Sequence, residues 1–440
     1  MQGRHSVSRR QFMAAAPAAA GAAYVIPSGV LAAQGKAGAA DRLTVAHIGV
    51  GGMGGGHLGM SLDFRKLGQV NIAAVCDVDQ SRLANAVKRV GAGCTPYRDY
   101  RFVLQRGDID AVVIATPDHW HAVQTVHACQ TGKHVYVEKP ASCTVKEGQA
   151  MLAAARQHKR VVQVGSQARS AKPAHQACTY LRNGMLGKMN RVTCWHTPNP
   201  TGGTAAPAPV PKTLDWDLWL GPLRWRPYVP GAYCHSVFRW LMESGGGVIR
   251  DRGAHVMSII LWCMNADKQA PVRIAATGTP PTEGIWDCPP VMKVVYTFKN
   301  PDWELVWEQP GKPRAEGGFG MVFHGENDEL VVGRDGTRIP AEEKARQFKV
   351  PAGGVEVYRM DKHANYNMNH KEDWFQAIKT GKKPCMDLEA GHRVANMNNL
   401  GNLSYLLGRP LNWDGDQERI IGDELANRLL GRPQRHPYHL

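Results

Sequence analysis

The sequence predicts an N-terminal α/β domain built on a parallel sheet, followed by a second, strand-rich α+β domain. An apolar run from Leu43 to Ile48 breaks directly into a glycine-rich turn. Apolar runs then alternate with helical stretches as far as Gly165, an order typical of a parallel sheet. Beyond Leu186 short strand-like runs dominate, and 440 residues leave room for two domains. The expected boundaries are 1–40 for a targeting segment, 41–166 for the α/β domain and 167–440 for the second domain.

The first 40 residues have the features of a targeting segment. Ser8 to Met13 spell Ser-Arg-Arg-Gln-Phe-Met, a twin-arginine signature, and an alanine-rich stretch follows. Pro17, Pro27 and the low hydrophobicity argue against a membrane span. We therefore expect export to the periplasm by the twin-arginine route, with removal of the signal peptide and no membrane insertion afterwards.

Composition excludes some classes of partner. The formal net charge is +15, but the Lys and Arg residues are scattered rather than gathered in a basic helix. We therefore expect no nucleic-acid partner. The ten cysteines form no Cys-x-x-Cys pair, and folding before export favours reduced thiols over disulfides. No metal site is expected.

The glycine turn reads Gly49-Val50-Gly51-Gly52-Met53-Gly54, a Gly-x-Gly-x-x-Gly pattern after a strand. Such a turn admits a pyrophosphate against bare amides at the start of a helix. Asp77 ends the next apolar run at the spacing expected for an acid that accepts a hydrogen bond from the ribose 2'-hydroxyl, which favours NAD over NADP. Arg82 could instead favour NADP, and Asp77 could simply cap the next helix. The expected cofactor contacts here are Gly49, Gly51, Gly52, Met53, Gly54 and Asp77.

Two later strands end in polar loops. The run Ile109 to Ala115 leads into Thr116-Pro117-Asp118-His119, and the next strand ends in Glu138-Lys139-Pro140. The carboxyl ends of parallel strands face the cofactor in such sheets, so Thr116, Pro117 and His119 are further candidate contacts. His119 and His121 could form a metal pair, but no third ligand stands nearby.

In order and spacing, the glycine turn, Asp77, the Thr-Pro loop and Glu138-Lys139-Pro140 resemble the Gfo/Idh/MocA oxidoreductase family, named for glucose-fructose oxidoreductase and inositol dehydrogenase. The resemblance extends over residues 43–440 and points to the exported branch of the family. It implies that Lys139 contacts both the nicotinamide ribose and the substrate. Glu138 is a further candidate cofactor contact and would position Lys139. The resemblance also implies a nicotinamide-lining loop with Gln167 and Arg169. The second domain would be a large, mostly antiparallel open sheet whose outer face forms a homodimer or homotetramer.

Asp251 and His255 are the candidate chemical centre. They are four residues apart, so on one helix they would share a face, although such a pair is also common as surface decoration. With the glycine triplet at 245–247 they match the family pattern Gly-Gly-Gly-x-x-x-Asp-x-Gly-x-His, which implies that Lys139, Asp251 and His255 are catalytic. Arg250 and Arg252 depart from the usual apolar neighbours. Arginines there would depress the Asp251 pKa or favour an anionic substrate such as a uronate.

Aromatic and polar residues between positions 214 and 240 could line a sugar pocket, because aromatic faces stack on the C–H face of a sugar ring. Tryptophans at three-residue spacing, such as Trp216 and Trp219, also commonly belong to a core. The candidate substrate contacts are His196, Tyr233, His235, Arg239 and Trp240.

Three functions remain open on this basis. The first is oxidation of a secondary hydroxyl of a sugar, polyol or glycoside, with NAD bound tightly because free NAD is scarce outside the cytoplasm. His255 would be the base, oriented by Asp251. The second is NAD-dependent glycoside cleavage, in which transient oxidation at C3 acidifies the C2 hydrogen and permits elimination. A base near C2, from His196, Tyr233 or His235, would favour this reaction. The third is a sugar- or nucleotide-binding protein without turnover.

Overall fold

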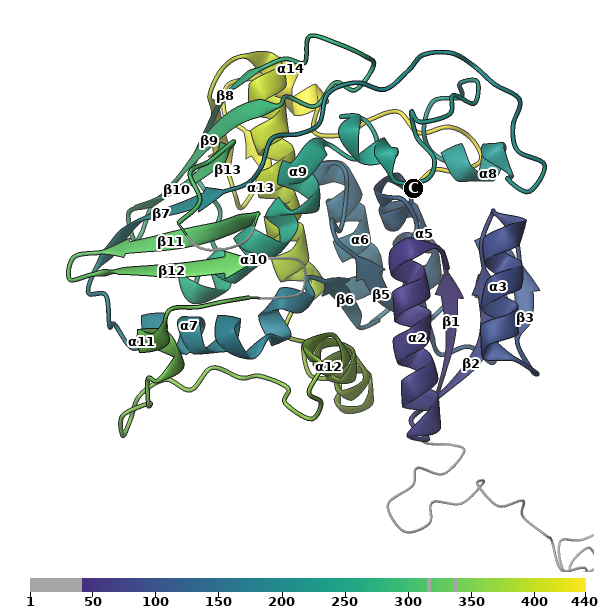
Figure 1. The fold of residues 1–440 in the computed structure, drawn as a ribbon, viewed down its shortest axis with the longest axis horizontal. Coiled ribbons are helices and arrows are strands. Elements are labelled where there is room, and N and C mark those ends of the chain that lie inside the picture. Colours follow the sequence, from purple (N-terminus) through teal and green to yellow (C-terminus); the bar gives the residue numbers. More distant parts are fainter. Residues whose placement is uncertain (1–41, 315–317, 335–338) are drawn as a thin grey trace, which may run out of the picture.

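The computed structural model describes residues 42–314, 318–334 and 339–440, and the predicted targeting segment lies outside them (Figure 1). The first sheet has six strands in the order β3-β2-β1-β4-β5-β6, and every recorded pairing in it is parallel. Burial on both faces explains the continuous apolar sequence of its central strand Ala111–Ile114. The strands are β1 (Leu43–Ile48), β2 (Val70–Cys76), β3 (Thr95–Tyr97), β4 (Ala111–Ile114), β5 (His134–Glu138) and β6 (Val162–Gly165).

Helices connect these strands, and side-chain caps fix where several of them begin. Asp79 accepts a hydrogen bond from the Ser81 N–H at 2.8 Å, which starts the second of the helices. Tyr97 ends the edge strand β3, and Asp99 accepts a hydrogen bond from the Arg101 N–H at 2.9 Å, which starts a short helix at Tyr100. The helices are α2 (Gly52–Lys66), α3 (Gln80–Val90), α4 (Tyr100–Leu104), α5 (His121–Gln130) and α6 (Val145–Gln157).

The second sheet has eight strands in the order β12-β11-β7-β10-β9-β8-β13-β14. The β7–β10 pairing is parallel and the other recorded pairings are antiparallel, which confirms the expected large, mostly antiparallel sheet. Buried and exposed residues alternate along β9, as expected when one face of a strand packs on the core. The strands are β7 (Met189–Trp195), β8 (Arg273–Thr279), β9 (Val291–Phe298), β10 (Trp303–Gln309), β11 (Phe319–Gly325), β12 (Glu329–Arg334), β13 (Leu411–Asp414) and β14 (Arg419–Ile420).

Helices of the second part of the chain fill the space between the two sheets (Figure 1). The most deeply placed is α10, in which every residue is buried. Within the described residues, no helix combines the length and apolarity that crossing a bilayer would need. The helices are α7 (Lys172–Arg182), α8 (Trp216–Leu220), α9 (Gly247–Asp251), α10 (Gly253–Cys263), α11 (Glu343–Arg346), α12 (Tyr366–Thr380), α13 (Leu388–Leu407) and α14 (Glu424–Arg428), with short 3₁₀ helices η2 (Asp118–Trp120), η3 (Gln167–Ser170) and η4 (Val237–Trp240).

Helix α12 returns to the first sheet and completes its core. Trp374 is fully buried in one apolar cluster with residues of α2 and of the first sheet. Its ring centroid lies 5.6 Å from that of Tyr136 on β5. The Gln163 side chain of β6 also donates to the His370 carbonyl at 2.7 Å. The first sheet is therefore held in part by residues that lie about 200 positions later in the chain.

We predict that Trp374→Ala lowers the free energy of unfolding by about 3–5 kcal/mol, because it leaves a cavity between α12 and the first sheet. Urea unfolding monitored by circular dichroism measures the change. Trp225→Ala is the control, since that side chain is 59% exposed and its removal should change stability by less than about 0.5 kcal/mol. Equal effects of the two substitutions would contradict the role assigned to α12.

Candidate active site

A cleft of about 1190 Å³ lies at the carboxyl ends of the first sheet's strands and extends to the second part of the chain. The loops after β1 and β4 both border it, and the strand order reverses between these two strands. Ligands of open α/β sheets bind at such a reversal point. Its other wall comes from α9, α10, the end of β12 and the start of α12.

The glycine turn forms one end of the cleft. Gly49 has φ +80°, and a Cβ there would lie 2.7 Å from the Ala115 carbonyl oxygen. A Cβ on Gly54 would lie 2.0 Å from the Gly49 oxygen, so only glycine lets α2 start this close to β1. Helix α2 begins at Gly52 with its free N–H groups at the cleft. These residues fit a dinucleotide pyrophosphate. Of the predicted contacts, Gly49, Gly51, Gly52 and Met53 line the cleft, whereas Gly54 is buried at the helix–strand contact.

Asp77 stands beside the turn and ties it to β2. Its carboxylate accepts hydrogen bonds from the Val50 N–H at 2.9 Å and the Asp79 N–H at 3.0 Å. Burial raises the pKa of Asp77, and these two hydrogen bonds only partly oppose the rise. Arg82 covers the turn, since a Cβ on Gly51 would lie 2.2 Å from its guanidinium. An acid and a cation thus both border this end of the cleft.

The loop after β4 contributes Thr116 and Pro117 to the cleft lining, but not His119. The His119 ring is fully buried, with Nε2 3.1 Å from the Trp219 carbonyl oxygen. Burial lowers its pKa to about 3, so the ring is neutral and attaches this loop to α8. His121 instead contacts the carbonyl oxygens of Pro140 and Thr116. No group of three or more potential metal ligands occurs in the part of the chain that the structure describes.

Lys139 and Asp251 meet across the middle of the cleft. The Lys139 ammonium at the end of β5 donates to the Asp251 carboxylate at the end of α9. Two more cations face the same carboxylate: Arg252 Nε at 3.3 Å and Arg239 Nε at 3.6 Å. Burial alone would raise the pKa of Asp251, but these three cations outweigh it and lower the pKa below its ordinary value. Asp251 therefore stays ionised and holds the Lys139 ammonium in place.

His255 lies one turn further along, in the first turn of α10. The sequence predicted Asp251 and His255 on one helix, but α9 ends at Asp251 and α10 begins at Gly253. His255 lines the cleft and is 3% exposed. Burial, together with the charges of Arg334 and Lys139, lowers its pKa well below the ordinary 6.5. At neutral pH the imidazole is therefore uncharged and has a lone pair for a proton.

Glu138 has partners other than the one expected. Its carboxylate lies 2.8 Å from His57 Nε2 and accepts from the Gln167 amide at 2.6 Å. Burial would raise the pKa of Glu138, but the hydrogen bond and charge of His57 lower it. Glu138 therefore positions Gln167, which lines the cleft, rather than acting on Lys139 through a hydrogen bond. His57 was not predicted, because a histidine in the middle of a helix carries no distinguishing spacing.

Arg169 and Tyr233 do not line the cleft. Arg169 is 2% exposed, with Nη1 2.9 Å from Asp267 and Nη2 donating to the Ser258 carbonyl at 2.7 Å. These contacts bind η3 to α10, so Arg169 supports the nicotinamide-side loop from behind. The Tyr233 hydroxyl donates to Glu243 at 3.0 Å and is also bound by Arg226.

The other predicted substrate contacts do line the cleft, at different ends. His196, Arg239 and Trp240 line it, as does His235, whose Nε2 lies 3.4 Å from Asp79 beside the glycine turn. Asn365, Tyr366 and Asn367, at the start of α12, line the cleft as well. Arg334 also lines it and was not among the predicted contacts, because its place depends on the order of the second sheet.

The neutral state of His255 predicts a pH dependence of stability. Its folded pKa is lowered, so the unfolded chain takes up the extra proton, and stability falls as the pH drops below about 6.5. We expect His255→Asn to flatten the fall in unfolding free energy by about 1.4 kcal/mol per pH unit between pH 6 and 5. Urea unfolding at pH 7, 6 and 5 measures this, and identical slopes for parent and variant would show that His255 is protonated in the fold.

Two family models match the chain. "Oxidoreductase family, NAD-binding Rossmann fold" matches residues 43–166, and "Oxidoreductase family, C-terminal alpha/beta domain" matches residues 188–302 and 346–440. Both are models of one oxidoreductase family and together they cover most of the chain.

Curated relatives carry the name "Glycosyl hydrolase family 109 protein". One from Shewanella pealeana is 36% identical over 115 residues, which is 24% of this chain and 25% of the relative. One from Shewanella baltica is 33% identical over 166 residues, 32% of this chain and 36% of the relative. The matched part spans about a quarter to a third of each relative's length.

Solved structures share the fold over most of the chain. The WlbA dehydrogenase from Bordetella pertussis, in complex with NADH and UDP-GlcNAcA, aligns with a TM-score of 0.64 at 15% identity over 85% of this chain and 99% of its own. A levoglucosan dehydrogenase, in complex with NADH and L-sorbose, aligns with a TM-score of 0.61 at 19% identity over 84% and 99%. At these identities the likeness concerns the fold.

Proposed function

Because the chain belongs to the Gfo/Idh/MocA oxidoreductase family, we propose that it oxidises a secondary hydroxyl of a sugar, polyol or glycoside with NAD. The observation that carries the proposal is that Lys139, Asp251 and His255 gather in the same cleft as the glycine turn. When bound, the nicotinamide supplies the hydride acceptor. The turn and Asp77 would hold the cofactor's pyrophosphate and ribose.

Lys139, Asp251 and His255 have different roles in removing the proton from the hydroxyl. His255 is neutral and would take the hydroxyl proton, help of a kind worth about 10² to 10⁴ in rate. Lys139 would donate a hydrogen bond to the same oxygen and stabilise the negative charge that develops there. Asp251 touches the Lys139 ammonium and neighbouring arginines, so it positions Lys139 rather than serving as the base.

Aromatic residues support a sugar as the ligand. Trp240, Trp219 and Phe238 border the cleft. The Trp219 ring also stacks on that of Trp216, with the ring centroids 5.1 Å apart in a buried cluster. These two tryptophans are therefore part of a hydrophobic core. The Trp240 ring has its centroid 6.4 Å from that of Trp286, and we assign it as the ring that would stack on a sugar face.

Glycoside cleavage by transient C3 oxidation is the second candidate, and the names of the curated relatives favour it. Of the three bases considered for C2, Tyr233 is buried in a separate contact and His235 stands at the glycine-turn end. His196 lines the cleft, with Nδ1 2.9 Å from the Thr197 carbonyl, a contact that leaves Nε2 as the acceptor nitrogen of the neutral ring. His196 would therefore be the C2 base.

Export and cofactor retention belong together in this proposal. A twin-arginine substrate crosses the membrane folded, so an exported enzyme would carry its NAD with it and reoxidise it in place. The cleft, enclosed by both parts of the chain, supports such retention.

The test is to purify the mature protein without added nucleotide, denature it, and quantify released NAD(H) and NADP(H). We expect about one equivalent of NAD(H) per chain, and NADP(H) instead would mean that Arg82 outweighs Asp77. Loaded protein is then screened for oxidation of sugars against release of aglycone from nitrophenyl glycosides. An empty protein that binds neither nucleotide would contradict the proposed function.

A further inference from the structure

A buried polar cluster lies behind the part of the cleft wall that the ends of β5 and β6 form. Its members are Glu138 at the end of β5, Gln167 after β6, Tyr136 on β5 and His57 on α2. All four residues are at most 4% exposed, and of the four only Glu138 and Gln167 line the cleft. The proposed reaction uses neither His57 nor Tyr136.

Hydrogen bonds fix which way round the Gln167 amide lies. Its Nε2 is 2.6 Å from Glu138 Oε1 and 3.0 Å from the Tyr136 hydroxyl oxygen. An ionised carboxylate can only accept, so the nitrogen of the amide, and not its oxygen, must face Glu138. Both N–H groups of the amide are then used. No described residue donates a hydrogen bond to Gln167 Oε1, which leaves this oxygen as an acceptor for a ligand in the cleft.

His57 keeps Glu138 in the ionised form that this orientation needs. Burial and the charge of Lys371 lower the pKa of His57, so the ring is neutral. Its buried Nδ1 has no hydrogen-bond partner among the described residues, which places the single ring proton on Nε2, 2.8 Å from Glu138 Oε1. Two N–H donors on one oxygen favour the carboxylate over the acid. A protonated Glu138 could instead donate to Gln167 and turn its amide over.

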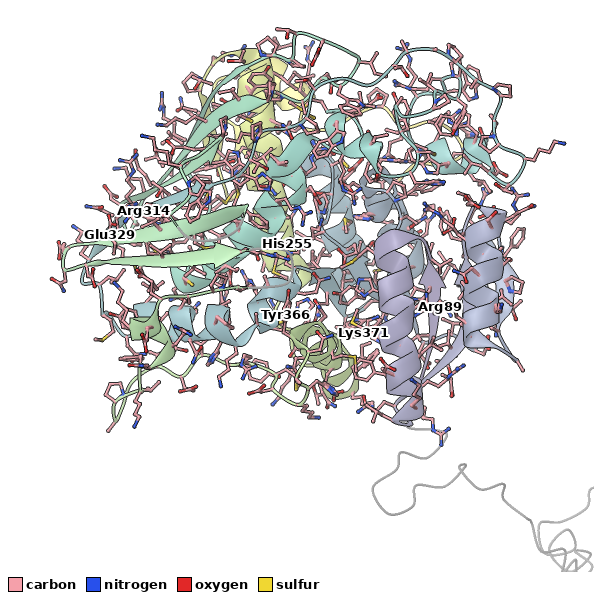
Figure 2. All side chains as sticks on the ribbon, viewed as in Figure 1. Arg89, His255, Arg314, Glu329, Tyr366 and Lys371 are labelled. Atoms are coloured by element: carbon pink, nitrogen blue, oxygen red, sulfur yellow. The ribbon has the colours of Figure 1, made fainter. Side chains whose placement is uncertain are left out.

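Helix α12 holds His57 in place from the other side. Lys371 reaches from α12 to α2 (Figure 2), where its ammonium donates to the His57 carbonyl and the Ser61 hydroxyl, both at 3.3 Å. The His57 ring also packs edge-on against that of Tyr136, with the ring centroids 5.0 Å apart. The imidazole therefore has little freedom to leave Glu138.

The strand order indicates which part of a dinucleotide would face Gln167. The glycine turn follows β1 and Asp77 follows β2, so the pyrophosphate and the adenosine ribose would occupy that side of the cleft. Strands β5 and β6 lie on the opposite side of β1, where the nicotinamide half would lie. The NH2 of its carboxamide is a hydrogen-bond donor, which matches the free acceptor of Gln167.

We propose that His57 is a positioning residue for the cofactor. Through Glu138 it holds the Gln167 amide so that Oε1 accepts an N–H of the nicotinamide carboxamide. This inference rests on the proposed function, because it concerns how the same cleft holds its NAD. It assigns to the cleft a selectivity for a pyridine ring that carries an N–H donor.

Nucleotide competition tests the inference without turnover. The probe is the 3-acetylpyridine analogue of NAD, in which a methyl group replaces the NH2 and no N–H donor remains. Protein is equilibrated with both nucleotides until the bound ratio is constant, and the bound share of each is measured by ultrafiltration. A hydrogen bond between uncharged groups is worth roughly two- to ten-fold in affinity. We expect the parent to prefer NAD, and this preference to fall at least about three-fold in Gln167→Met.

Gln163→Met is the matched control. Gln163 is also buried, follows β6 in the same direction and donates through Nε2 to the His370 carbonyl at 2.7 Å, but it does not line the cleft. This variant should keep the full preference for NAD.

Two substitutions of His57 test the positioning role. His57→Leu removes the donor to Glu138 and should lower the preference as Gln167→Met does. His57→Gln supplies an amide N–H in its place and should restore the preference at least in part. A merely structural role would leave the preference unchanged in both. This pair carries the test if Gln167→Met does not fold.

The outcomes separate the inference from the proposed function. Equal binding of NAD and the analogue by the parent, or a preference that survives in Gln167→Met or His57→Leu, overturns the inference and leaves the proposed function standing. A preference lost in these variants, in a protein that neither oxidises sugars nor releases aglycone, supports the inference and contradicts the proposed function. A protein that binds neither nucleotide contradicts both.

Discussion

The ion pair between Lys139 and Asp251 is the contact on which the site depends. Lys139 ends β5 of the first sheet and Asp251 ends α9, so the pair joins the two halves of the molecule within the cleft. Both side chains are nearly buried, and a buried charge without its partner is strongly destabilising. The two halves must therefore be held in one relative position. Helices α12 and α13 provide this, because they pack on the first sheet and also on elements of the second part of the chain.

Polar contacts at the strand ends also hold neighbouring elements of the cleft in fixed positions. Asp77 at the end of β2 binds the amide of the glycine turn, and Glu138 at the end of β5 binds both α2 and Gln167. Each carboxylate joins a strand end to a neighbouring loop or helix. The cleft thus has walls that are set before any ligand enters, which lowers the ordering cost of binding.

The first domain could be predicted well, because its glycine turn, caps and apolar runs are local signals. The directions of side chains could not be predicted. His119 and Arg169 follow strands at the expected edge, yet their rings and charges point into the protein, where backbone carbonyls bind them.

The other features that could not be predicted depend on contacts between segments far apart in the sequence. Arg334 reaches the cleft only because the order of the second sheet brings β12 there. The spacing of residues along the sequence does not predict a contact that depends on the order of strands in the sheet. The helix break at Arg252 is similar: a four-residue spacing predicts one helix, but α9 ends at Asp251 and α10 begins at Gly253, and both side chains still line the cleft.

A double-mutant cycle on Lys139→Met and Asp251→Asn, measured by the free energy of unfolding in urea, tests the central claim most directly. If the two side chains form the contact that joins the two halves, their effects are coupled, by roughly 1–3 kcal/mol. The double variant should then be clearly more stable than the sum of the single losses indicates. Additive losses, within about 0.5 kcal/mol, would contradict the account.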